Sequence, residues 1–337
     1  MFSKADRYST IPHIMYLNQN SLKEDILSLK KEKNVTFLAH YYEDGEIQDL
    51  ADKVGDSFFL AKEGQKSESQ IILLAGVVFM AESVKILNPT KKVIVPDLDA
   101  GCSLVKESPY EDYLKWRRQH PTGIAVTYIN SSAEVKAISD VIVTSSNAAA
   151  IIDSIPKDRP ILFGPDKNLG SFLSKKLNRE MILWPGSCEV HILFSAKKLY
   201  ELSLQYPKAV VLAHPECDPA VLQYAHVIGS TSRLLEEVEK NPATQFIVAT
   251  EPGILHQMKK SRHDNVELIE APQEGSCGCN NCPYMKMNTL EKIKNALLTE
   301  TPEIKMDSDL INRASISLQR MMDITSGKPV TWPDRFT

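Results

Sequence analysis

The sequence lacks a hydrophobic run long enough to cross a membrane. Its longest apolar run, residues 71–81, ends at Glu82 and falls short of the roughly 20 residues that a spanning helix needs. The N-terminal residues also lack the apolar stretch of a secretory signal. We therefore expect no membrane partner and a cytoplasmic location.

A basic excess is also missing, since the formal net charge is -4. Nucleic acid is therefore not an expected partner. With 43% hydrophobic and 24% charged residues, the chain has the composition of a globular protein. Its 337 residues exceed one ordinary domain and suggest two or three.

Cysteines are few, and a reducing cytosol disfavours a disulfide framework for them. Their remaining roles are metal ligand, nucleophile or buried small hydrophobic residue. The six are Cys102, Cys188, Cys217, Cys277, Cys279 and Cys282.

Short β-branched runs alternate with amphipathic stretches along most of the chain. This alternation predicts parallel βαβ units. The expected strands are residues 35–39, 57–61, 70–77, 92–96, 123–129, 140–144, 160–163, 181–184, 209–213, 225–228, 245–249 and 266–269. Amphipathic helices at 22–31, 111–118 and 192–204 precede the three sets of four strands.

The polar residues at the strand ends recur with a constant period. His40, Tyr128 and His214 end the first strand of each set, at separations of 88 and 86 residues. The same separations relate the hydroxyl residues in or after the second strands: Ser57, Ser145 and Thr231. A period this long indicates a repeated domain rather than a solenoid unit.

These repeats predict an α/β protein of three similar αβα domains, each with a four-stranded parallel sheet. The expected domains are residues 1–105, 106–190 and 191–284, followed by a helical tail, 285–337, whose first helix at 290–298 packs back on the body. Ligands bind at the carboxyl ends of parallel strands. We expect a pseudo-threefold arrangement around one central active site, although three domains with independent loops are the simpler alternative.

The loop after each fourth strand carries cysteine: Cys102, Cys188 and the group within residues 277–282. Thiolates suit zinc or iron–sulfur clusters. Three ligands on a cubic [4Fe–4S] cluster leave one iron open to act as a Lewis acid, whereas structural zinc normally takes four ligands. A local zinc half-site formed by the CxCxxC group with His256 or His263 is the alternative, but it leaves Cys102 and Cys188 unexplained.

Over nearly its whole length the sequence resembles the quinolinate synthase family, the A protein of bacterial de novo NAD synthesis. The resemblance rests on many motifs in the same order. They are AHYYEDGEIQDLAD (39–52), GDSFFLA (55–61), GVVFMAESVKILNP (76–89), VPDLDAGCSL (95–104), TYIN (127–130), TSSNA (144–148), FGPDKNLG (163–170), WPGSCEVH (184–191), HPEC (214–217), GSTS (229–232), ATEPGIL (249–255) and CPYMKMN (282–288).

The resemblance implies a [4Fe–4S] cluster held by Cys102, Cys188 and Cys282, the last chosen because it directly precedes PYMKMN. It implies condensation of iminoaspartate with dihydroxyacetone phosphate to give quinolinate, phosphate and water. Functional coupling to L-aspartate oxidase, the source of the unstable imine, is implied as well. Some family members carry CxxCxxC where this chain has CxCxxC, so the roles of Cys277 and Cys279 stay open.

The substrates are anionic and the reaction moves protons, which suggests roles for the other motif residues. Glu216 is the expected general base, and the expected catalytic residues beside it are His214, His191 and Tyr42. The expected substrate-binding residues are His40, Ser57, Tyr128, Asn130, Ser145, Ser230 and Thr231. For any one serine alone, a helix N-cap is the simpler interpretation. Glu82 and Glu251 could be catalytic, but an interdomain salt bridge is the simpler interpretation of each. Cys217 is interpreted as a buried neighbour of Glu216.

Two other functions remain open from the residues. An iron–sulfur hydro-lyase acting on a hydroxy acid would share the open iron but would not need a phosphate ester. A zinc-stabilised binding protein would contain one zinc and no iron.

Overall fold

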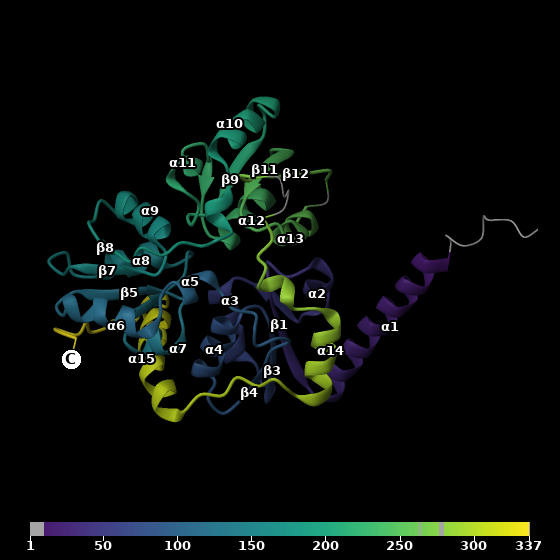
Figure 1. The fold of residues 1–337 in the computed structure, drawn as a ribbon, viewed down its shortest axis with the longest axis horizontal. Helices are drawn as coiled ribbons and strands as arrows, with labels where there is room; N and C mark the ends of the chain where they lie inside the picture. The colour runs from purple at the N-terminus through teal and green to yellow at the C-terminus, as the bar shows by residue number, and fades with distance from the viewer. Residues whose placement is uncertain (1–9, 263, 276–279, 337) are drawn as a thin grey trace, which may run out of the picture.

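The computed structural model describes residues 10–262, 264–275 and 280–336 (Figure 1). Within these ranges the strands form three four-stranded sheets in which all neighbouring strands are parallel. The predicted α/β fold with three similar units is therefore confirmed. No helix in the described part of the chain has both the length and the apolar character that crossing a membrane requires.

The three sheets share one strand order, in which the first strand lies between the second and the third. The first sheet contains β1 (Val35–His40), β2 (Lys53–Gly55), β3 (Ile71–Ala75) and β4 (Lys92–Ile94). The second contains β5 (Ile124–Tyr128), β6 (Val141–Val143), β7 (Ile161–Gly164) and β8 (Ile182–Leu183). The third contains β9 (Val210–Ala213), β10 (Val227–Ile228), β11 (Gln245–Ala249) and β12 (Glu267–Glu270).

Helices connect the strands and cover the sheets. In the first unit they are α1 (Thr10–Glu32), α2 (Gly45–Leu50), α3 (Ser57–Lys66), α4 (Val78–Leu87) and α5 (Ser103–Lys106). The second unit has α6 (Tyr110–Gln119), α7 (Ala133–Ala137), α8 (Ala148–Ser154) and α9 (Lys167–Leu177). The third has a 3-10 turn (His191–Leu193), α10 (Ala196–Gln205), α11 (Pro219–Leu222), α12 (Thr231–Lys240) and α13 (Ile254–Lys260). The C-terminal part has a 3-10 turn (Met285–Met287), α14 (Leu290–Thr299) and α15 (Ser308–Thr325).

The strand predicted at residues 57–61 is wrong, because these residues belong to α3. The second strand is the shorter edge strand β2, which precedes them. Asp56 lies between the two and caps the helix, since its carboxylate accepts a hydrogen bond of 2.8 Å from the Phe59 N–H. Ser57 is consequently the first residue of a helix and not a strand residue.

The C-terminal helices pack against the first two units. The helix α14 packs on α1 and the first sheet around Ile293 and Leu297. The helix α15 lies beside α7, and its apolar face joins the core shared by the first and second sheets (Figure 1). Ser317 of α15 donates a buried hydrogen bond of 2.8 Å to the Lys136 carbonyl at α7. The third sheet keeps separate cores, at the top of Figure 1.

Candidate active site

A cavity is lined by residues that follow strands of all three sheets. Its polar lining comprises His40, Tyr42, Asp56, Ser57, Cys102, Tyr128, Asn130, Thr144, Ser145, Cys188, His191, His214, Glu216, Thr231, Glu251 and Cys282. Every residue that the sequence predicts for the site lines this cavity except Ser230. Ser230 lies next to Thr231 and caps α12, where its hydroxyl accepts a hydrogen bond from the Arg233 N–H.

Glu216 lies among three polar side chains and is only 3% exposed. The Tyr128 hydroxyl donates to its Oε1 at 2.6 Å, and His191 Nδ1 lies 3.2 Å from its Oε2. His214 Nδ1 lies 3.6 Å from Oε1. Burial raises the pKa of Glu216, but the two histidines and the Tyr128 hydroxyl outweigh burial and lower the pKa below its ordinary value. The carboxylate is therefore ionised and able to accept a proton.

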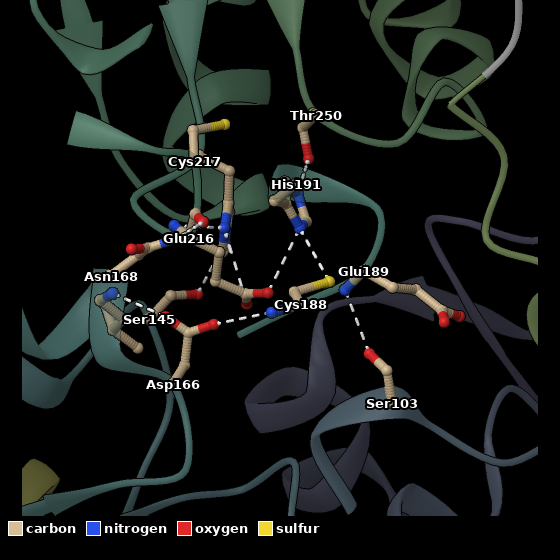
Figure 2. Close-up of polar contacts among 12 residues, drawn as sticks. Ser103, Ser145, Asp166, Asn168, Cys188, Glu189, His191, Glu216, Cys217 and Thr250 are labelled. Carbon is tan, nitrogen blue, oxygen red and sulfur yellow. Dashed lines mark hydrogen bonds and ion pairs between the residues drawn. The ribbon is translucent and has the colours of Figure 1, made fainter. Parts of the chain in front are cut away.

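A second line of contacts runs from the first unit to the third through Thr250. The Tyr42 hydroxyl lies 2.8 Å from the Thr250 hydroxyl, which lies 3.0 Å from His191 Nε2. His191 Nδ1 then contacts both Glu216 and the Cys188 sulfur, the latter at 3.2 Å (Figure 2). Sequence reasoning did not assign Thr250 a role, although it lies in the ATEPGIL motif directly after β11.

Ser145, His214 and Glu216 form a third line that joins the second and third units. His214 Nε2 lies 3.3 Å from the Ser145 hydroxyl, on the side of the ring opposite the Glu216 contact. Burial lowers the pKa of His214 to about 3, and that of His40 likewise to about 3. Both imidazoles are therefore neutral at pH 7, so each ring can donate one hydrogen bond and accept another.

Two helices begin at the cavity, and their first residues carry hydroxyl groups. Ser57 is the first residue of α3, and Thr231 is the first residue of α12. Asp56 and Ser230 each cap one N–H group of these helices. The N–H groups that remain free, together with the positive dipole end, favour anions. Asp56, also at the cavity, accepts a hydrogen bond of 2.6 Å from Ser232 and so ties the two helix starts together. The arrangement suits a ligand with carboxylate or phosphate groups.

Cys102, Cys188 and Cys282 bring one free thiol each to the cavity, from three loops far apart in the sequence. Burial raises the pKa of Cys102 to about 12 and that of Cys282 to about 11. The pKa of Cys188 is raised as well, first by burial and then by Glu216 and Cys102. The thiols therefore keep their protons unless a metal displaces them, as is usual for thiolate ligands.

This donor set fits an iron–sulfur cluster, because it places three soft ligands around one cavity. A smaller set is also present: ligand atoms of Cys188, His191 and Glu216 lie within 4.8 Å of one another. Those three could hold a single metal ion. Cys277 and Cys279 lie outside the described residues.

The sequence matches a known protein family over most of its length. A family model described as Quinolinate synthetase A protein matches residues 24–323. The chain belongs to this family. The predicted resemblance to the quinolinate synthases is thereby confirmed.

Relatives named quinolinate synthase match the chain over most of its length. The one from Rippkaea orientalis is 47% identical over 326 residues, which cover 96% of this chain and 100% of that relative. The one from Chloroherpeton thalassium is 50% identical over 310 residues, 92% of this chain and 96% of that relative. The one from Nostoc punctiforme is 49% identical over 300 residues, 89% and 92% of the two chains.

Two further predictions from the sequence concern residues near the site. Cys217 is fully buried after Glu216, and its S–H donates to the Ala249 carbonyl at 3.4 Å. Glu251 forms an ion pair of 3.4 Å with Lys286 and also lines the cavity. In the part of the chain that the structure describes, Glu82 links the first unit to the second through a hydrogen bond of 3.1 Å from the Ala133 N–H, and not through the predicted salt bridge.

Proposed function

We propose that the chain condenses iminoaspartate with dihydroxyacetone phosphate to give quinolinate, phosphate and water, in de novo NAD biosynthesis. The observation that carries the proposal is the single cavity to which three α/β units each bring a cysteine and polar side chains. The names of the relatives support it, because each covers most of this chain.

The proposed cofactor is a [4Fe–4S] cluster held by Cys102, Cys188 and Cys282. When bound, such a cluster supplies one open iron as a Lewis acid for a carboxylate or hydroxyl of the substrate. The support comes from the three free thiols at one cavity and from the family to which the chain belongs.

In this proposal the helix starts at Ser57 and Thr231 bind the carboxylate and phosphate groups, with Ser145 and Asn130 beside them. The relevant chemistry is electrostatic, since N–H groups and hydroxyls offset the negative charges of both substrates. His40 and Ser230 belong to the same proposed set. Both are buried near the cavity, at 6% and 4% exposure.

Proton transfer is assigned to Glu216 and its neighbours. The ionised Glu216 accepts a proton from substrate carbon, and Tyr128 holds its Oε1 in place. His214 lies between Glu216 and Ser145, so it can pass a proton between the carboxylate and a hydroxyl at the cavity. Tyr42 and His191 are connected through Thr250, and they can protonate a hydroxyl that leaves as water.

The decisive experiment is anaerobic purification followed by metal analysis and a product assay. About four irons with sulfide per chain are expected, and quinolinate should form only when dihydroxyacetone phosphate is present. Each of the six cysteines is replaced by alanine in turn, and only the variants at positions 102, 188 and 282 should lose the cluster. Product without the phosphate ester would instead indicate a hydro-lyase.

The second candidate is a zinc-stabilised binding protein, which the Cys188, His191 and Glu216 group favours. A single zinc and no iron in the anaerobic protein would support it. A cytoplasmic location, coupling to L-aspartate oxidase and domain boundaries near residues 106 and 190 stay predictions.

A further inference from the structure

Two buried carboxylates occupy matching places in the second and third units. Asp166 follows β7, the third strand of its sheet, and Glu251 follows β11, the third strand of its own. Both side chains belong to fully buried residues, with 0% exposure. A carboxylate in such a place costs free energy unless both of its oxygens have partners.

Asp166 uses its two oxygens in two different loops. Its Oδ1 accepts the Leu169 N–H at 2.7 Å and so caps α9. Its Oδ2 accepts the backbone N–H of Cys188 at 3.2 Å, and Figure 2 shows the carboxylate directed toward that peptide. One side chain thus joins the loop after the third strand to the cysteine loop after the fourth.

Glu251 repeats this arrangement in the third unit. Its Oε2 accepts the Gly253 N–H within its own loop at 2.7 Å. Its Oε1 accepts the backbone N–H of Cys282 at 3.3 Å. Lys286 also approaches Oε1 at 3.4 Å and donates to the Tyr42 carbonyl at 2.8 Å.

The first unit joins the loop after its third strand to its cysteine loop without a carboxylate. Residues 76–77, which follow β3, are Gly and Val. Here the Val78 N–H donates to the Ala100 carbonyl at 2.8 Å, which ties the start of α4 directly to the loop of Cys102. In all three units the segment after the third strand therefore holds the cysteine loop, and in two of them a carboxylate makes the connection.

We propose that Asp166 and Glu251 are positioning residues that fix the peptides of Cys188 and Cys282 and so direct these two thiols into the cavity. The proposal rests on the proposed function for the meaning of the thiols as cluster ligands. Partners that orient a metal ligand in this way typically change metal affinity by about 10- to 100-fold when they are removed.

Amide substitutions test the proposal because they preserve size and remove one acceptor. In Asp166→Asn or Glu251→Gln, the amide oxygen can accept one of the two N–H groups, while the NH2 group faces the other donor. Iron and sulfide per chain are first measured on the anaerobically purified full chain. A chelator then removes the metal from the wild type and all variants alike, because loss of a shared cluster would by itself expose all three thiols. Site-resolved alkylation of these metal-free samples, followed by peptide mass spectrometry, measures the reactivity of each cysteine.

The expected pattern is specific to position. Asp166→Asn should raise alkylation of Cys188 and leave Cys282 near the wild-type rate. Glu251→Gln should do the reverse. Both variants should lose iron on dilution more readily than the wild type. Cys217 is fully buried and serves as the internal reference for unfolding.

Asp140→Asn is the matched control. Asp140 is also a buried carboxylate, and its Oδ2 accepts the Ala125 N–H and the Arg117 guanidinium, both at 2.7 Å, with no cysteine among these partners. This variant should lower the melting temperature without changing the alkylation pattern. Parallel increases at Cys188, Cys282 and Cys217, or unchanged rates at Cys188 and Cys282, would overturn the proposal. A wild-type protein without iron would refute the proposed cluster. The positioning proposal would still be tested in that case, because the alkylation rates report where the thiols lie.

Discussion

Glu43 is a buried acid, and its titration should make the stability of the protein depend on pH. It is fully buried after β1, and its Oε1 accepts a hydrogen bond of 2.8 Å from the Asn288 side chain. Among the described residues its Oε2 has no hydrogen-bond partner. Burial raises the pKa of Glu43 to about 8, although Asn288 and Lys286 act to lower it, while Asp44 and Glu251 raise it further.

The pKa of Glu43 differs between the folded and the unfolded chain, and this difference sets how the free energy of unfolding depends on pH. In the unfolded chain the carboxyl has its ordinary pKa of about 4.5, whereas burial in the folded chain raises the pKa to about 8. Between these values the folded state binds the extra proton, so the free energy of unfolding falls as the pH rises. At about 1.4 kcal/mol per pH unit, the full interval gives an upper limit of about 5 kcal/mol.

Glu43→Gln replaces the acid by a neutral group of the same shape, so it should remove this fall in the free energy of unfolding with rising pH. We expect the variant to differ little from the wild type at pH 5 and to be more stable by about 3–5 kcal/mol at pH 8.5. Urea unfolding of both proteins across this range measures the difference. Glu46→Gln, at an exposed ion pair with Lys23, is the control and should show almost no trend. A Glu43→Gln protein whose added stability does not grow with pH would refute the reasoning.

Three further predictions concern the site and the cores. Glu216→Gln should lower kcat about 10²- to 10⁴-fold without loss of iron, and a wild-type rate would rule out its role as base. Arg117→Met leaves the buried Asp140 without its cation, so urea unfolding should show a loss of about 3–5 kcal/mol; less than 1 kcal/mol would contradict this. Phe246→Ala, at a fully buried position in the third sheet, should cost about 3–5 kcal/mol in the same assay, and a smaller loss would mean that the core refills the space.

The fold was predictable where strands are buried on both faces. β5 and β7 are buried at every position, and their sequences are almost wholly apolar. The edge strand β2 is different, because its three residues, Lys-Val-Gly, carry little apolar signal. The neighbouring Ser-Phe-Phe-Leu-Ala run is the stronger apolar signal, but it begins a helix that Asp56 caps.

The site was predictable where chemistry repeats at matching positions. Cysteine, histidine and hydroxyl residues at the strand ends identify the cavity before any contact is known. Asp166 and Thr250 could not be assigned in the same way, since each is an ordinary residue for a loop after a strand. Their importance comes from contacts across long separations: 22 residues from Asp166 to Cys188 and 208 from Thr250 to Tyr42.

The position of α15 also has a consequence for how the protein is made. This helix follows all three sheets along the chain, yet its apolar face completes the core that the first two share. A nascent chain that already contains every proposed ligand still exposes the surfaces of α7 and β6 that α15 covers. Exposed apolar surface of this kind favours chaperone binding and aggregation. A chain that stops before Ser308 is therefore expected to be recovered as an insoluble product.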